Sequence, residues 1–306
     1  MGNKSLQQGM ILAFSAYLLW GFLPIYWKQL DTIEAGTILA HRIIWSCVFM
    51  LLLVVLSGKW RSFLHSIKHI RKERKKIIAI TAASVVITLN WFLFIFAVNG
   101  GHVLQASLGY YINPILSILL GLIILKEPST KSQIFSFILA GVAVVYLTLG
   151  YGIFPWISIF LAASFAIYGF IKKTLDLSAM FGLTLETLVM TPFALLYIWF
   201  APQAQGFSLN PILTLENLFL IGGGIVTAIP LLLFSAGARR IPLASVGFLQ
   251  YVAPTVMFFL GVFLYKESFT THHMITFLFI WIALAIYMYS LYKQLPRKQR
   301  KKTLTT

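Results

Sequence analysis

The chain has 306 residues, of which 59% are hydrophobic and only 10% are charged, and its mean hydropathy is +0.87. A soluble domain carries about 25% charged residues, so this composition excludes an ordinary soluble protein and indicates an integral membrane protein. The formal net charge of +16 would suit nucleic acid in a soluble protein. Here the basic residues lie beside apolar runs, which favours anchoring on anionic lipids at the cytoplasmic face and argues against nucleic acid.

Apolar runs long enough to span a bilayer follow one another along the chain. A spanning helix needs about 20 mostly apolar residues, so this length allows roughly ten spans and leaves little for a soluble domain. Open strands would leave unpaired backbone groups in lipid, so the runs are predicted to be helices. No small-residue cleavage site follows the first run, which is therefore a retained span. The runs lie at about 10–28, 37–57, 77–98, 103–125, 132–149, 152–172, 180–200, 217–238, 242–265 and 271–292.

The basic residues are distributed unequally between the two sides of the membrane. Of the 24 lysines and arginines, all except Lys28, Arg42 and Lys266 fall in segments on one side. Loops that carry an excess of Lys and Arg stay in the cytoplasm. Both termini are therefore predicted to be cytoplasmic.

One stretch occurs twice: residues 110–127, YYINPILSILLGLIILKE, match residues 250–267, QYVAPTVMFFLGVFLYKE. The two halves meet near residues 150–155, and each contains five predicted spans. Because five is odd, the second half enters the membrane from the opposite side, which makes an inverted-topology repeat. The predicted fold is all-α, with ten transmembrane helices in two inverted five-helix halves, 1–150 and 151–306, the second with a basic C-terminal tail. Identical residues in the two copies are Tyr111/Tyr251, Pro114/Pro254, Leu120/Leu260, Gly121/Gly261, Lys126/Lys266 and Glu127/Glu267.

Ionisable groups inside a span are costly and are functional candidates by default. The second predicted span contains His41 and Arg42, and the seventh contains Glu186 at the matching place of its half. If these groups face a shared central cavity, Arg42 could hold an anionic group, and Glu186 could bind a cationic group or exchange a proton. The alternatives are a buried ion pair that locks helices together, and snorkelling to the interface from about one or two turns inside a helix end.

Pro114 and Pro254 fall at the same place in the two copies. A proline inside a helix donates no hydrogen bond and crowds the carbonyl four residues earlier. Loosened backbone within the membrane is tolerated where it is buried in protein or lines a wet cavity. We therefore assign both prolines to gating, with a static packing kink as the alternative. Asn113, beside Pro114, adds a group that can donate and accept hydrogen bonds.

Aromatic and amide side chains gather on the same spans. Aromatic walls with a few hydrogen-bonding groups suit amphipathic organic solutes and also cations, although such residues also form interfacial belts and cores. The second copy replaces Tyr110 and Asn113 by Gln250 and Ala253, so the site should be chemically asymmetric. Besides His41, Arg42, Asn113 and Glu186, the candidates for binding a solute are Trp20, Trp45, Asn90, Trp91, Tyr110 and Gln250.

The basic segment 59–76 spaces its apolar residues as a helix does. An amphipathic helix on the inner leaflet and a plain positively charged loop both fit this pattern. His65 and His69 lie four residues apart, but the surrounding cations argue against a metal ion. The single cysteine, Cys47, excludes an intramolecular disulfide. We predict neither a metal nor a cofactor.

Sequence motifs of common catalytic sites are absent from the chain. There is no G-x-x-x-x-G-K-[ST] loop, which argues against transport driven by ATP within this chain. There is also no H-E-x-x-H and no G-x-S-x-G, which argues against a membrane hydrolase. The sequence therefore favours a solute carrier over an enzyme, with a passive channel and a non-transporting scaffold as alternatives.

Several motifs resemble the drug/metabolite transporter superfamily, in particular EamA-type proteins of the RarD group. The resemblance covers nearly the whole chain and implies alternating access by two inverted five-helix halves in a bacterial inner membrane. It also implies a small organic solute, a metabolite or drug, and export as the direction. Proton or ion coupling, and a monomer or a homodimer, are left open. The motifs are AYLLWGFLPIYWK at 16–28, LAHRIIWS at 39–46, NWFLFIFAVN at 90–99, QASLGYYINPILSILLG at 105–121 and GLTLETLVMTP at 182–192.

Overall fold

The computed structural model of the protein describes residues 3–30, 32–99, 103–151, 154–201, 214–264 and 271–294. Within these ranges the regular structure is helical throughout. A 3₁₀ turn spans Lys28–Leu30, and π-helical turns span Leu120–Ile124 and Leu260–Leu264. The α-helices are α1 (Asn3–Trp27), α2 (Ala35–Leu56), α3 (Trp60–Ile70), α4 (Arg74–Asn99), α5 (Val103–Leu119), α6 (Lys131–Tyr151), α7 (Trp156–Thr174), α8 (Ala179–Phe200), α9 (Leu215–Ala238), α10 (Leu243–Gln250), α11 (Val252–Phe259) and α12 (Thr271–Gln294).

The expected apolar runs coincide with these helices. In the described part of the chain, nine helical segments are long and apolar enough to cross a membrane. The run expected at 103–125 corresponds to α5 and its π turn, whose apolar part, Leu108–Ile124, is shorter than the others. The prediction of an all-α multi-pass membrane protein is confirmed, whereas a count of ten spans remains a prediction.

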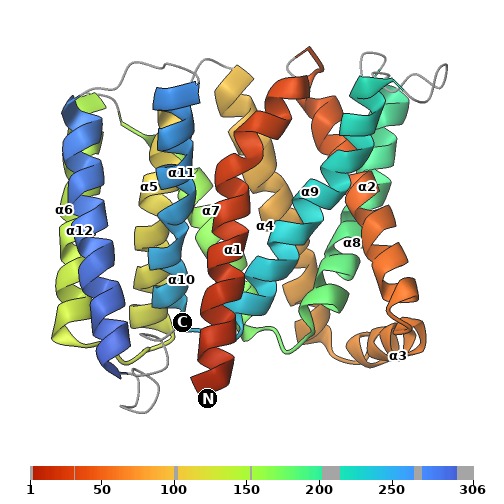
Figure 1. The fold of residues 1–306 in the computed structure, drawn as a ribbon. Coiled ribbons are helices and arrows are strands. Elements are labelled where there is room, and N and C mark those ends of the chain that lie inside the picture. The colour runs from red at the N-terminus through yellow and green to blue at the C-terminus, as the bar shows by residue number, and fades with distance from the viewer. Residues whose placement is uncertain are drawn as a thin grey trace, which may run out of the picture.

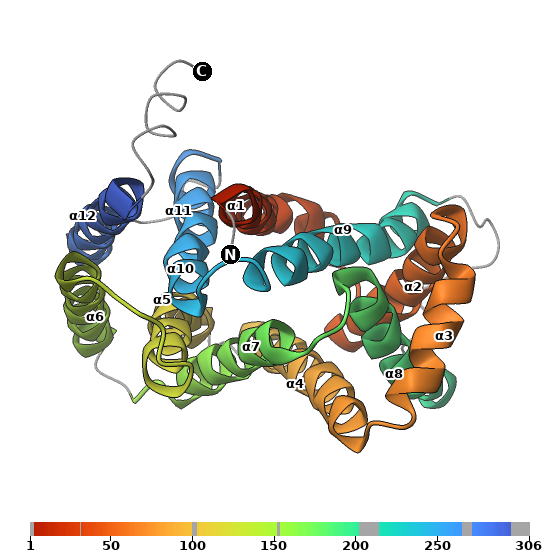
Figure 2. The same cartoon turned by 90° about the horizontal axis from the view of Figure 1, so that it is seen from below.

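The long helices stand side by side, and the short helix α3 lies across one end of the bundle (Figure 1). That end also holds the N-terminus of α1 and the turns that follow α7 and α9. Because Lys172, Lys173, Arg239 and Arg240 lie there, we call it the basic end. Seen along the helices, α6 and α12 form a pair at one side, and α2 and α8 lie at the other (Figure 2). Helices α1, α4, α5, α7, α9, α10 and α11 lie between them.

The core is continuous through the middle of the bundle. One cluster joins α1, α4, α7, α9 and α10 around the fully buried rings of Tyr168 and Phe234, which stack 5.9 Å apart. A second cluster joins α5, α6, α10 and α12, where Phe248 stacks on Tyr287 at 3.8 Å. Helix α10 contributes to both clusters and thereby connects them.

The two copies of the repeated stretch pack directly against each other. Helix α10 runs antiparallel to α5, since Gly247 lies against Ile118 and the Pro114 carbonyl while Ala244 lies against Gly121. A Cβ at Gly247 would lie 2.7 Å from the Pro114 carbonyl oxygen, so only glycine permits this approach. Both copies change to a π-helical turn at the same place, Leu120–Ile124 and Leu260–Leu264.

The matched prolines lie in different local structures. Pro114 is inside the continuous helix α5. Pro254 follows a break at Tyr251, where α10 ends and α11 begins. The Gln250 carbonyl would be the partner of residue 254, which as a proline has no N–H to donate. The backbone is therefore interrupted in the second copy only, and the gating role of both prolines remains a prediction.

The basic segment after α2 forms an amphipathic helix. Phe63 is 1% exposed on α3 and its ring lies 5.4 Å from that of Phe181 on α8. Of the two interpretations, helix and loop, the helix is therefore the one observed. The rings of His65 and His69 are 4.8 Å apart, but the described residues contain no group of three metal-binding side chains.

Candidate solute-binding site

Arg42 enters the bundle between four helices. Its guanidinium lies over the Trp27 ring of α1 at 4.5 Å and over the Trp91 ring of α4 at 4.8 Å. Its Nε donates a hydrogen bond to Thr227 Oγ1 of α9 at 3.1 Å. Tyr110 of α5 is near enough to interact with it electrostatically. These contacts show that Arg42 points into the protein and does not snorkel toward the membrane surface.

The charge of Arg42 is tolerated without being neutralised. No carboxylate in the described part of the chain forms an ion pair with it, and its Nη groups donate to no described acceptor. An arginine inside a spanning helix costs roughly 2.5–3.5 kcal/mol on insertion scales. Each cation–π contact offsets about 0.5–2 kcal/mol of that cost. The site therefore holds a stable cation that still has unused hydrogen-bond donors.

A cavity of about 630 Å³ lies between α2, α4 and α8. Its walls include Leu39 and Ile43 of α2, Phe92 of α4 and Met190 of α8. Trp91 packs against the apolar cluster that contains Leu39 and Ile43, and its ring also lies under the Arg42 guanidinium. Arg42 itself does not line the cavity. A volume of this size is in the usual range for small organic ligands.

A second polar group joins the two copies of the repeat. Gln250 Nε2 donates to Ser117 Oγ at 3.1 Å, and Ser117 Oγ lies 3.5 Å from Asn113 Oδ1. The Tyr17 hydroxyl lies beside Gln250 but makes no hydrogen bond of normal geometry. The predicted candidates Asn113 and Gln250 are thus brought together, through a serine that the sequence did not single out.

Glu186 is in a different place and has its own partners. Its carboxylate accepts from Lys172 Nζ at 2.6 Å and from Tyr168 Oη at 3.0 Å. The Lys172 and Glu186 side chains are 3% and 2% exposed. Arg42 lies two turns inside the start of α2, at the end opposite to the basic end, whereas Glu186 lies two turns inside the start of α8, at the basic end. The structure does not bring Arg42 and Glu186 together, and Glu186 forms the buried ion pair weighed as the alternative.

The remaining candidates occupy packing positions. Trp20 lies among the rings of Tyr17, Phe165 and Phe234. Asn90 donates to the Leu161 carbonyl and to Ser164, which ties α4 to α7. Trp45 lies where α2 meets Gly224 of α9, and His41 is buried on α2 beside Arg42. Of the predicted residues, Arg42, Trp91 and Tyr110 form one cluster, and Asn113 and Gln250 form another.

Glu127 forms a junction with α7 and α10 at the basic end. Its carboxylate accepts from the backbone N–H groups of Leu243 and Ala244, at 2.7 and 3.0 Å. These are the first residues of α10, whose N-cap, Pro242, offers no side-chain cap. A carboxylate at this position also interacts favourably with the helix dipole. Lys173 Nζ of α7 lies 3.4 Å from Glu127 and donates to the Ile241 carbonyl, which completes the junction.

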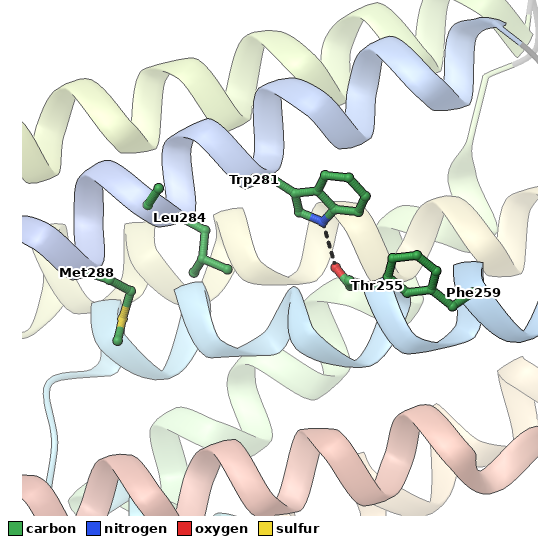
Figure 3. A pocket seen from close by; sticks show the side chains of 6 residues that line it. Thr255, Phe259, Trp281, Leu284 and Met288 are labelled. Carbon is green, nitrogen blue, oxygen red and sulfur yellow. Dashed lines mark hydrogen bonds between the residues drawn. The ribbon is translucent and has the colours of Figure 1, made fainter. Parts of the chain in front are cut away.

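A groove between α11 and α12 is less suited to binding a polar solute. It has a volume of about 460 Å³ and is lined by Phe259, Leu284, Met288 and their neighbours (Figure 3). Its indole donor is already used, since Trp281 Nε1 donates to Thr255 Oγ1 at 3.1 Å. The groove offers apolar contact but no unused polar group that would orient a ligand.

Besides Ser117 and Lys172, sequence reasoning missed three further residues. Trp27 lies seven residues after Trp20 on α1, and this spacing could have indicated a shared helix face. Glu127 belongs to the repeated Lys-Glu pair, which marked it as unusual without showing its partner. Thr227 had no local signal, because its role depends on how α9 packs against α2.

Comparison with known proteins agrees with these features. The EamA-like transporter family matches residues 7–149. An uncharacterized transporter of Bacillus subtilis, YojE, is 41% identical over 95% of this chain and 96% of its own. The protein RarD of Escherichia coli is 41% identical over 94% of this chain and 96% of its own. One solved crystal structure shares the fold, with a TM-score of 0.72 at 17% identity, over 95% of this chain and 100% of that chain.

The fold and the interior cation define a multi-pass membrane protein with a polar site inside its helix bundle. The chain belongs to the EamA-like transporter family, within the RarD group. The family and one of these two relatives are named as transporters, which supports a transport function for this protein and not an enzymatic one.

The ion pair of Lys172 and Glu186 leads to a test of its structural role. Glu186→Gln leaves a buried ammonium without its charged partner, which should destabilise the protein by about 3–5 kcal/mol. The double variant Lys172→Met/Glu186→Gln should recover most of that loss, because no unpaired charge remains. Thermal unfolding of the purified protein in detergent measures both effects. A Glu186→Gln protein as stable as the wild type would contradict this account.

Proposed function

We propose that the protein is a secondary transporter that exports small organic metabolites or drugs by alternating access. The observation that carries this proposal is Arg42, a cation inside the helix bundle that forms no ion pair with any described carboxylate. The cost of burying this charge is explained if a negatively charged group of the solute pairs with the Arg42 guanidinium. Its family membership supports transport.

The proposed architecture is ten spans in two inverted halves. The antiparallel packing of α5 and α10 and the matched π turns support it. The neighbours also correspond: α5 packs on α7 and α11 packs on α1, while α1 packs on α9 and α7 packs on α4. In each of these two pairs, the first contact turns into the second when both helices are replaced by their equivalents in the other proposed half. Because cytoplasmic loops carry an excess of Lys and Arg, the basic end is proposed to face the cytoplasm.

The Glu127 junction closes the cytoplasmic end in this arrangement. It ties the end of α5 to the start of α10 and to α7. The site at Arg42 lies toward the other end. In alternating access, the two halves would separate at this junction when the site opens to the cytoplasm. Pro114 and Pro254 would supply the bends that this movement needs.

Two other functions remain as alternatives. A passive channel would need a continuous path past Arg42 and past the Glu127 junction. A scaffold would leave the cation and the cavity without a purpose. No specific feature of the structure favours either one.

Deletion and overexpression of the gene, followed by metabolite profiling of cells and medium, tests the transport function. We expect a solute that accumulates in the medium on overexpression and in the cells on deletion. Arg42→Ala, at matched abundance in the membrane, should abolish this effect, because the solute loses its charged partner. Arg61→Ala, which removes an exposed arginine on α3, is the matched control. The proposal fails if no solute responds in opposite directions in the two strains.

The Glu127 junction gives a separate prediction about access from the cytoplasm. With Cys47 replaced by alanine, Ser117→Cys places a single thiol at a position that is 1% exposed between α5 and α10. Glu127→Gln should speed its labelling by a membrane-impermeant maleimide in inverted vesicles by about three- to tenfold. The reason is that the charged cap of α10 and its ion pair are lost.

Glu73→Gln serves as the control for this labelling experiment. Glu73 is an exposed carboxylate at the same end of the bundle and pairs with Lys76, one helical turn away. If both variants label at the same rate, Glu127 does not hold the cytoplasmic end closed.

A further inference from the structure

The donors that Arg42 leaves unused determine what could complete its site. Nε is bound to Thr227, and the two indole rings occupy positions over the guanidinium. Nη1 and Nη2 donate to no described residue. Neither nitrogen is fully enclosed by the protein, so a ligand can reach both. Paired guanidinium N–H groups match the two oxygens of a carboxylate and bind them in parallel. The open side therefore fits an oxyanion.

The charge around Arg42 limits the charge of that oxyanion. Lys172 is neutralised by Glu186 toward the basic end, and Lys28, the next cation along the chain after Trp27, is exposed. Among the described residues around this site, Arg42 is thus the one positive charge. A phosphate monoester carries about −1.5 to −2 at neutral pH, which would leave negative charge uncompensated in a medium of low dielectric constant. A monoanion gives the neutral complex.

The remaining walls are apolar or aromatic. Trp27, Trp91 and Tyr110 surround the cation, and Trp91 packs in turn on the apolar cluster of Leu39, Ala40, Ile43 and Ala194. Such walls stabilise an apolar body through burial but offer few hydrogen bonds to a highly hydroxylated solute.

We propose that the site at Arg42 binds a small organic monocarboxylate with an apolar body, held by the guanidinium Nη groups. This inference deepens the proposed transport function and rests on it for the role of the bound solute. Thr227 is a positioning residue, because its bond to Nε fixes the guanidinium and leaves the Nη side free.

Binding to the purified full chain in detergent tests the inference, with thermal unfolding as the readout. The probes are benzoate, indole-3-acetate and octanoate, three monocarboxylates with different apolar bodies. Each has a neutral amide of nearly the same shape as its control, and phenyl phosphate tests a dianion. We expect at least one carboxylate to raise the melting temperature as its concentration passes its Kd. Its amide, and phenyl phosphate, should bind at least tenfold more weakly.

Variants show whether the guanidinium is responsible. Arg42→Gln should weaken carboxylate binding by about ten- to a hundredfold, because a charge-assisted pair of hydrogen bonds is lost. Arg42→Lys keeps the charge but not the paired donors. Its affinity for the carboxylate should lie between those of the wild type and Arg42→Gln. Arg61→Gln, on exposed α3, should bind as the wild type does. If Arg42→Gln fails to fold, the wild-type protein still tests the inference, because each acid should bind more tightly than its amide.

Three results would overturn the inference: no stabilisation by any of the three acids, equal stabilisation by the acids and their amides, or binding that Arg42→Gln leaves unchanged. The transport function fails separately. Arg42-dependent carboxylate binding without transport in proteoliposomes would leave the site standing and remove the carrier. Transport of a neutral or cationic solute that the acids do not inhibit would support the carrier and contradict the carboxylate site.

Discussion

Where α10 meets α5, the absence of a side chain at Gly247 lets two backbones approach to a separation that any other residue would prevent. The same contact is joined by hydrogen bonds between Gln250 and Ser117 in its middle and is capped by Glu127 at the basic end. Helix α10 also belongs to both large core clusters. The arrangement of the other helices therefore depends on this one pairing. The stretch that the sequence repeats is also the place where its two copies pack on each other.

This pairing also explains why the two strongest candidates lie apart. Arg42 and Glu186 fall at matching places of the two predicted halves, and in the inverted arrangement proposed above such places lie toward opposite ends of the bundle. Each then acquires different surroundings. Glu186 faces Lys172 in the last turn of α7 and forms a buried ion pair with it. Arg42 faces two indoles and a hydroxyl, so its charge has no carboxylate partner among the described residues.

The sequence was sufficient for the helices because apolar length is a local property. Each predicted run corresponds to a helix, and even the matched π turns lie at the repeated Leu-Gly. The partners of each polar residue could not be predicted in this way. Lys172 was counted only as a positive charge at a membrane face, yet it is buried against Glu186. Thr227, which accepts a hydrogen bond from Arg42, lies 185 positions further along the chain. Such contacts depend on helix rotation and crossing, which hydropathy does not specify.

The central claim is that the two halves carry a solute bound at Arg42 and open to one side at a time. Counterflow in proteoliposomes tests it most directly, with the solute named by metabolite profiling. Unlabelled solute inside the vesicles should accelerate the entry of labelled solute from outside, with saturation as the outer concentration rises. Arg42→Gln should abolish this acceleration in a folded protein. Flux that rises linearly with concentration, and that solute on the far side does not change, would contradict the account and indicate a channel.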